Sequence, residues 1–143
     1  MKREKNFQVG DKANLTRTIA EDDILSFAEV SGDFNPLHLD ESYAQTTLFK
    51  GRIAHGMLGV SMLSALIGNV LPGPGSIYLS QKVEFKRPVR IGDCITAEVE
   101  ISAIDDNKGW LILATTCYNQ DGLEVITGEA CIKILPQKGG QEK

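Results

Sequence analysis

The fold is decided by one stretch of the chain, Ala54-His55-Gly56-Met57-Leu58-Gly59-Val60-Ser61-Met62-Leu63-Ser64-Ala65-Leu66-Ile67-Gly68-Asn69-Val70-Leu71. From Met57 onward the stretch is apolar on nearly every side, and it ends at the turn Pro72-Gly73-Pro74-Gly75. A helix that is apolar all round has no face for solvent and lies inside a protein. The stretch also holds two serines, an asparagine and three glycines, so it falls short of the roughly 20 apolar residues that a membrane span needs. It therefore predicts the buried central helix of a soluble domain.

Two features of this predicted helix suggest a function in addition to its place in the core. Its start, His55-Gly56, stands where a Ser, Thr, Asp or Asn usually caps the first free N–H groups. Such an uncapped start is a candidate receptor for a developing negative charge. Small residues also recur at spacings of three and four, which places them in one stripe that another group can approach closely. The stripe consists of Ser61, Ser64, Ala65 and Gly68.

The chain has 143 residues, and its 42% hydrophobic and 24% charged residues are typical of one globular domain. We expect a single domain over residues 1–136, followed by a disordered polar tail over residues 137–143. The net charge is −4 and the basic residues are dispersed along the chain. No nucleic-acid partner is therefore predicted.

The N-terminal residues and the cysteines indicate the cellular compartment. Met1-Lys2-Arg3-Glu4-Lys5-Asn6 leads into no apolar segment, so no signal peptide is predicted. The three cysteines are odd in number, lack paired metal-ligand spacing and lie in strand-like runs. We therefore expect Cys94, Cys117 and Cys131 to be reduced thiols in a cytoplasmic protein.

The rest of the chain predicts helices before the central helix and strands after it. Residues 21–30 and 41–46 have helical patterns, and residues 13–19 alternate as a first strand. Four further strands are rich in Val, Ile, Thr and aromatic residues and are separated by short turns, so we expect consecutive strands to pair antiparallel. These strands cover residues 77–85, 94–104, 110–118 and 125–135. The sum is an α+β fold in which a five-stranded antiparallel sheet wraps one long helix.

A candidate for acid–base chemistry lies between the first two predicted helices. Asp33 and His38 bracket Phe34-Asn35-Pro36-Leu37, and Pro36 stiffens this loop. A carboxylate and an imidazole held rigidly together can act as a general acid–base pair. The alternative is that these residues only form a turn, because Asp and Asn before a proline are ordinary turn residues.

Two other kinds of site receive less support from the sequence. A metal site formed by Asp33, His38, Asp40 and His55 would have no recognised ligand spacing, so we expect no metal. Ser61 and Ser64 lack the Gly-x-Ser-x-Gly frame of a serine nucleophile. Serines within a helix more often bond to the carbonyl one turn back.

Two motifs resemble the MaoC-like (R)-specific enoyl-CoA hydratases, and most closely the short-chain type that supplies polyhydroxyalkanoate synthesis. The first is Gly32-Asp33-Phe34-Asn35-Pro36-Leu37-His38-Leu39-Asp40, and the second is Ile53-Ala54-His55-Gly56-Met57-Leu58. The likeness continues through Phe85-Lys86-Arg87-Pro88-Val89 to Thr127-Gly128-Glu129-Ala130 and covers about residues 9–135.

The resemblance implies a hot-dog fold and a homodimer, or a higher homo-oligomer, with active sites at the subunit interface. It places the family's catalytic residues on Asp33 and His38, its oxyanion-binding glycine on Gly56 and its motif serine on Ser64. With a weaker match, it places acyl-pocket positions at Ile67 and Cys131.

The activity that the resemblance implies is hydration of trans-2-enoyl-CoA to (R)-3-hydroxyacyl-CoA, and the reverse dehydration. It requires no metal or redox cofactor, because coenzyme A is part of the substrate. Two alternatives stay open, a hot-dog acyl-CoA thioesterase and a non-catalytic acyl-thioester-binding module. The thioesterase would more usually need a carboxylate near the start of the central helix, and residues 57–71 contain no acid. Acyl length, the choice between coenzyme A and acyl carrier protein, the pathway and the identity of the formal base are left open.

Overall fold

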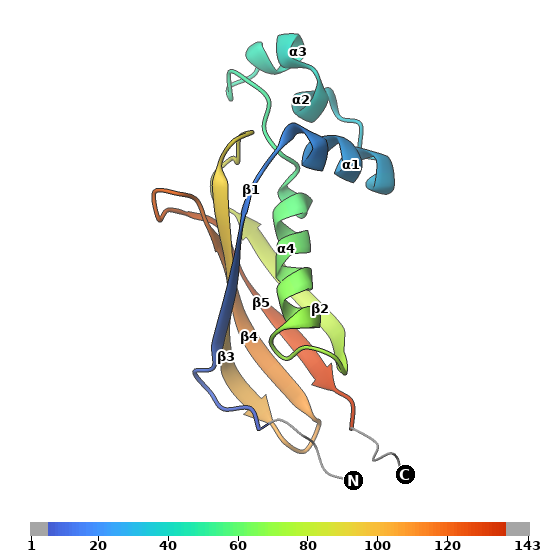
Figure 1. The fold of residues 1–143 in the computed structure, drawn as a ribbon, viewed down its shortest axis with the longest axis vertical. Coiled ribbons are helices and arrows are strands. Elements are labelled where there is room, and N and C mark those ends of the chain that lie inside the picture. Colours follow the sequence, from blue (N-terminus) through green and yellow to red (C-terminus); the bar gives the residue numbers. More distant parts are fainter. Residues whose placement is uncertain (1–5, 137–143) are drawn as a thin grey trace.

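The computed structural model describes residues 6–136. The tail that we expect over residues 137–143 lies outside the described residues. Five strands and four helices follow one another in the chain (Figure 1). They are β1 (Lys12–Thr18), α1 (Glu21–Ser31), α2 (Pro36–Leu39), α3 (Glu41–Gln45), α4 (Gly56–Asn69), β2 (Ser76–Phe85), β3 (Cys94–Asp105), β4 (Trp110–Tyr118) and β5 (Glu124–Ile134).

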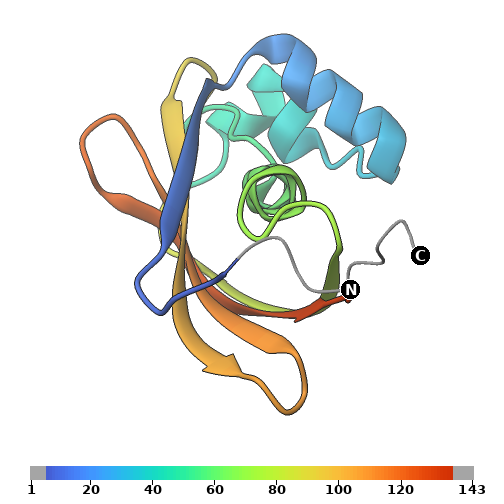
Figure 2. The same ribbon diagram turned by 60° about the horizontal axis from the view of Figure 1, so that its bottom comes forward.

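The sheet curves around α4, which is seen end-on inside the curve in Figure 2. All five strands are antiparallel to their neighbours, in the order β1-β3-β4-β5-β2. The predicted α+β architecture of one long helix wrapped by a five-stranded antiparallel sheet is confirmed, and this arrangement is a hot-dog fold.

One predicted strand pairing is wrong. We expect consecutive strands to pair, and β3–β4 and β4–β5 do, but β2 pairs with β5 while β3 pairs with β1. The segment of residues 86–93 is a crossover rather than a hairpin turn. It contains a local turn, in which the N–H of Asp93 donates to the carbonyl of Arg90 at 3.0 Å. It also bonds to distant parts of the chain, since the N–H of Gly92 donates to the carbonyl of Ile19 at 2.7 Å and the carbonyl of Val89 accepts from the N–H of Ala54 at 2.7 Å. The crossover thus passes the end of the sheet where α4 begins.

The hydrophobic core lies between α4 and the concave face of the sheet. Met62, Leu63, Leu66 and Ile67 of α4 are at most 5% exposed and pack against inward-facing strand residues such as Leu113. Burial of such side chains is the main favourable contribution to folding.

The prediction that α4 has no exposed face is wrong for this chain. The stripe of small residues, Ser61, Ser64, Ala65 and Gly68, is exposed, because the sheet covers one side of the helix and the stripe lies on another. Within residues 6–136, no helix has both the length and the apolar character needed to cross a membrane.

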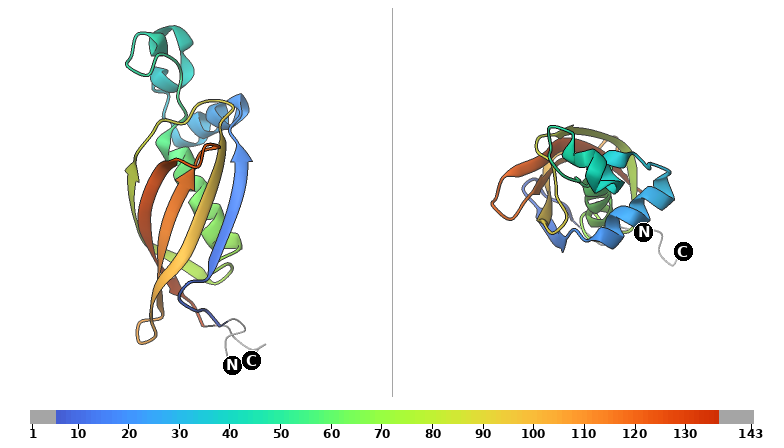
Figure 3. Two further views of the ribbon diagram at one scale, coloured as in Figure 1. Left: turned by 90° about the vertical axis from the view of Figure 1, so that its left-hand side faces the viewer. Right: turned by 90° about the horizontal axis from the view of Figure 1, so that it is seen from above.

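Helices α1 to α3 gather beyond the N-terminal end of α4 (Figures 1 and 3). Arg52, in the segment that leads into α4, joins them. Its guanidinium donates to both carboxylate oxygens of Glu21 in α1 at 2.9 and 3.2 Å and to the carbonyl of His38 in α2 at 2.7 Å. This half-buried side chain therefore fixes the short helix α2 against α1.

We predict that Gly128→Ala destabilises the protein by about 1–3 kcal/mol, the range found for overpacked sites. A Cβ at this position of β5 would lie 1.9 Å from the carbonyl oxygen of Lys82 in β2, so the two strands would have to separate. Urea unfolding followed by circular dichroism measures the effect.

The matched control is Gly68→Ala in α4, where a Cβ would meet nothing within 4 Å. Alanine is favoured over glycine inside a helix by about 0.5–1 kcal/mol, so this variant should be slightly more stable than the wild type. Equal midpoints for Gly128→Ala and the wild type would contradict the close approach of β2 to β5.

Candidate active site at the start of the central helix

The loop that carries Asp33 is held by short-range hydrogen bonds. The hydroxyl of Ser31 accepts from the N–H of Asp33 at 3.1 Å, and the carboxylate of Asp33 accepts from the N–H of Asn35 at 3.1 Å. The side chain of Asn35 then caps α2 by accepting from the N–H of Leu37 at 3.0 Å, with Pro36 as the first helical residue. The stiff loop predicted from Pro36 is thus built, and Asp33 is exposed at its start.

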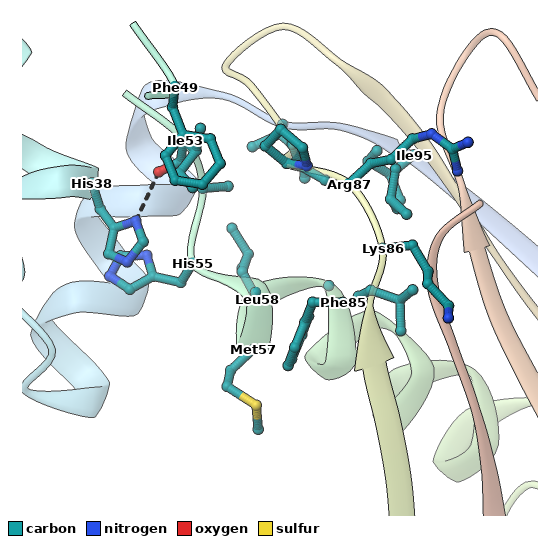
Figure 4. Close-up of a pocket in the computed structure, with 18 residues that line it drawn as sticks. His38, Phe49, Ile53, His55, Met57, Leu58, Phe85, Lys86, Arg87 and Ile95 are labelled. Carbon is teal, nitrogen blue, oxygen red and sulfur yellow. Dashed lines mark hydrogen bonds between the residues drawn. The ribbon is translucent and has the colours of Figure 1, made fainter. Parts of the chain in front are cut away.

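His38 lies on α2 with its imidazole buried, since only 8% of the residue is exposed. Its Nδ1 lies 2.8 Å from the carbonyl oxygen of Ile53 (Figure 4). A carbonyl can only accept, so Nδ1 carries the hydrogen and Nε2 presents its lone pair. His38 therefore has an acceptor nitrogen available for a proton.

The surroundings of His38 favour its neutral form. Burial of the imidazole is the largest influence that holds the pKa of His38 below its ordinary value of 6.5, and the nearby His55 acts in the same direction. The bond to the carbonyl of Ile53 and the carboxylate of Asp33 both act to raise this pKa. The net direction is downward, so the ring is neutral near pH 7 and can accept a proton.

The start of α4 is uncapped, as the sequence predicts. His55 is the N-cap residue, and its side chain makes no capping hydrogen bond. Gly56 is required there by a close contact, because a Cβ on this residue would lie 2.6 Å from the ring of Phe85. The first turn of α4 thus presents backbone N–H groups at a position that only glycine fits.

A cavity of about 390 Å³ lies at this helix start and contains His38, His55 and Gly56 in its lining. Figure 4 shows the two histidines at one end of it, with Phe85 and Lys86 across the space from them. Most of the other lining side chains are apolar, and Lys86 and Arg87 add positive charge. An apolar cavity with a few convergent polar groups is typical of a small-molecule site.

Asp33 lies close to His38 and His55, which line this cavity, although Asp33 itself is not among the lining residues. One carboxylate oxygen and one ring nitrogen of each histidine lie within 4.8 Å of one another. Two groups bonded to one water lie about 4.6 Å apart, so one bound water could reach Asp33 and a histidine of this group together.

The structure does not bring every predicted site residue to this cavity. Ser64 lies on the exposed face of α4, Ile67 is 1% exposed within the core, and neither lines the cavity. Cys131 of β5 stands between Ala130 and Ile132, which belong to the core, so its side chain projects from the opposite face of the sheet. The roles of Ser64, Ile67 and Cys131 stay predictions.

The sequence does not predict the contacts of His55 and Arg52. The side chain of His55 bonds the backbone carbonyl of Asp33 and lies against the ring of His38. Arg52 bonds the carbonyl of His38. The position of His55 beside an uncapped helix start was a local signal, whereas nothing near Arg52 in the sequence indicates its partners.

Comparison with known proteins gives one consistent result. Residues 5–118 match the family model described as MaoC like domain. An (R)-specific enoyl-CoA hydratase from Rhodospirillum rubrum is 47% identical over 135 residues, covering 94% of this chain and 92% of the relative. One from Aeromonas caviae is 46% identical over 130 residues, covering 91% and 97%. The solved (R)-hydratase from A. caviae involved in PHA biosynthesis matches with a TM-score of 0.88 and 47% identity, over 92% of this chain and 99% of that chain.

We predict that the pKa of His38, measured by NMR titration of its ring carbons, lies below 6.5. Asp33→Asn should lower it further, because the carboxylate of Asp33 favours the protonated imidazole. Only two histidines contribute signals, so a single His55 variant assigns them. Asp22→Asn, an exposed acid on α1, is the control and should leave this pKa unchanged. A pKa above 6.5 would contradict the burial of His38.

Proposed function

The chain belongs to the MaoC-like family of hot-dog enzymes, and we propose that it is an (R)-specific enoyl-CoA hydratase. In this proposal it adds water to trans-2-enoyl-CoA, gives (R)-3-hydroxyacyl-CoA, and catalyses the reverse dehydration. The observation that carries the proposal is the meeting of a carboxylate, an imidazole with a free Nε2 and an uncapped helix start beside one cavity. The names of relatives that are 46–47% identical support the same reaction.

Asp33 and His38 hold one water between them in the proposed mechanism. As the water oxygen bonds to C3, His38 takes a proton from it at Nε2, and the carboxylate of Asp33 accepts its other hydrogen bond. The electron pair of the double bond moves onto the thioester, and the proton on His38 then passes to C2. Each well-placed acid or base group contributes about 10²–10⁴-fold. Because the oxygen and the proton are delivered from one side of the alkene, the proposed addition places both on one face.

The first turn of α4 stabilises the negative charge that develops on the thioester oxygen. The N–H of Gly56 is the proposed donor, because the helix start has no side-chain cap. Loss of one such preorganised donor costs about 3 kcal/mol of barrier lowering in other enzymes. The ring of Phe85, which lies against Gly56, holds the donor in place.

The proposal needs no cofactor and fits a cytoplasmic protein. Coenzyme A belongs to the substrate, and water is the only other reactant. A hot-dog thioesterase is less well supported, because α4 contains no carboxylate. A binding module that performs no chemistry would not require the tautomer of His38 that leaves Nε2 free.

We further propose that the active form is a homodimer joined through β2. This strand is ten residues long and forms one edge of the sheet. Ile77, Tyr78 and Leu79 are 37–45% exposed along it. Long, apolar, uncovered edge strands pair readily with another chain, and pairing of two β2 strands around a two-fold axis would give one continuous sheet.

We predict that the wild type hydrates crotonyl-CoA to (R)-3-hydroxybutyryl-CoA and that Asp33→Asn and His38→Ala each lose at least about a hundredfold in kcat. Loss of the enoyl-thioester absorbance gives the rate, chiral chromatography gives the configuration, and circular dichroism checks folding. Asp22→Asn is the matched control and should keep the wild-type rate.

A wild type that binds crotonyl-CoA and longer enoyl-CoAs, and also enoyl carrier-protein thioesters, without consuming the double bond would refute the hydratase proposal. Hydrolysis to free coenzyme A would instead identify a thioesterase. An (S) product would retain the reaction class but refute its stereochemistry.

The dimer proposal predicts that Ile77→Lys combined with Leu79→Lys gives a monomer, because two charges would be placed along the β2 edge. Sedimentation equilibrium measures the mass. The control combines Leu48→Lys and Leu123→Lys, two exposed apolar residues away from β2, and should leave the mass unchanged. A wild type that is monomeric at micromolar concentration would contradict the proposal.

A further inference from the structure

We propose, on the basis of the hydration reaction proposed above, that His55 is a positioning residue that fixes the Asp33 carboxylate, the His38 ring and the first turn of α4 relative to one another. In the mechanism proposed above, Asp33, His38 and Gly56 carry out the chemical steps, and His55 has no role. Its side chain nevertheless bonds the backbone carbonyl of Asp33 and lies against the ring of His38, and its backbone begins α4.

The protonation pattern of His55 follows from its one hydrogen bond. Its Nε2 lies 3.0 Å from the carbonyl oxygen of Asp33, and because a carbonyl only accepts, Nε2 carries the hydrogen. Nδ1 then bears a lone pair. That atom is buried and has no hydrogen-bond partner among residues 6–136. An unsatisfied buried lone pair destabilises a fold, so stability alone would favour an apolar ring here.

The bond from Nε2 is a long-range connection to the catalytic loop. The other hydrogen bonds of Asp33 within the described part of the chain stay inside the loop, since they join it to Ser31 and Asn35. His55 follows Asp33 by 22 residues. The Nε2–H group of His55 therefore connects the exposed end of the loop, at Asp33, to the start of α4.

The ring of His55 also supports the ring of His38. Their centroids are 4.0 Å apart and their planes differ by 32°, and Phe27 of α1 contacts His55 with centroids 4.9 Å apart. Figure 4 shows the two imidazoles against each other, with the bond from His38 to Ile53 leading away from the stack. The stack and that bond together leave His38 one orientation.

The backbone of His55 completes the arrangement. Its carbonyl accepts from the N–H of Leu58 at 3.1 Å, which forms the first turn of α4, and the N–H of Ala54 bonds to Val89 of the crossover. Gly56 follows directly in the chain. A displacement of the His55 side chain would therefore move the acid–base pair relative to the proposed oxyanion donor.

Two substitutions separate the ring from the hydrogen bond. His55→Phe keeps a flat ring against His38 but has no donor, and His55→Gln has no ring but places an amide N–H near the position of Nε2. A misplacement of about 1 Å can cost about a hundredfold in rate. We expect His55→Phe to lower kcat on crotonyl-CoA by about 10–100-fold with KM changed less than about threefold, and His55→Gln to recover at least half of that loss on a logarithmic scale. Tyr43→Phe on α3 is the control and should match the wild type.

A second readout does not depend on turnover. In His55→Phe, the amide hydrogens of Asp33 and Asn35 should exchange faster than in the wild type, while those of the β3 and β4 strands are unchanged. NMR hydrogen exchange measures both sets in the same sample. If circular dichroism shows that His55→Phe does not fold, His55→Gln is compared with His55→Ala instead. The amide hydrogen of Asp33 should then exchange more slowly in His55→Gln than in His55→Ala.

Failure of this inference differs from failure of the proposed function. An inactive wild type refutes the hydratase proposal, and the exchange of Asp33 and Asn35 still decides the position of the loop. The positioning role would be overturned if the wild type is active and the His55→Phe variant keeps the wild-type kcat and the wild-type amide exchange at Asp33 and Asn35. Equal loss of more than about a thousandfold in both variants would overturn it as well, because His55 would then act in the chemical steps.

Discussion

The structure depends on the burial of one side of α4 against the concave face of the sheet. Leu63 and Leu66 are fully buried there, together with strand residues that include Val99 and Leu113. At the start of the helix, Gly56 contacts Phe85 at the end of β2, and the crossover of residues 86–93 bonds Ala54 just before it. The proposed catalytic groups Asp33 and His38 therefore lie beyond the hydrophobic core, on the short segments around α2.

Three backbone carbonyl groups accept hydrogen bonds that hold these segments in place. The carbonyl of Ile53 sets the tautomer of His38, the carbonyl of Asp33 sets that of His55, and the carbonyl of His38 accepts from Arg52. A carbonyl has a fixed polarity and cannot donate, so each of these bonds leaves one protonation pattern. The tautomers of both histidines are thus set by backbone groups, and the Arg52–Glu21 ion pair supports α2 from outside.

Much of this arrangement could be predicted from the sequence because it is local. The apolar run of α4, the alternation of the strands, the Asp33–His38 loop and the uncapped helix start each depend on neighbouring residues. The pairing of β2 with β5 could not be predicted from local signals, since the crossover of residues 86–93 has the turn residues of a hairpin. The bond between His55 and Asp33 joins residues 22 positions apart, and it depends on where α1 and α2 pack. Ser64 is exposed because the curved sheet covers only one side of α4. The periodicity of apolar residues in the sequence does not predict how far the sheet curves.

The contact between Phe85 and Gly56 has a consequence for how assembly and chemistry are coupled. Phe85 is the last residue of β2, and its ring occupies the space where a Cβ on Gly56 would stand. Any shift of the edge strand along or out of the sheet is thus transmitted to the first turn of α4 through a single aromatic ring. In the proposed dimer, the edge strand that joins the subunits and the proposed oxyanion donor would meet at this ring, so a substitution that alters one would also affect the other.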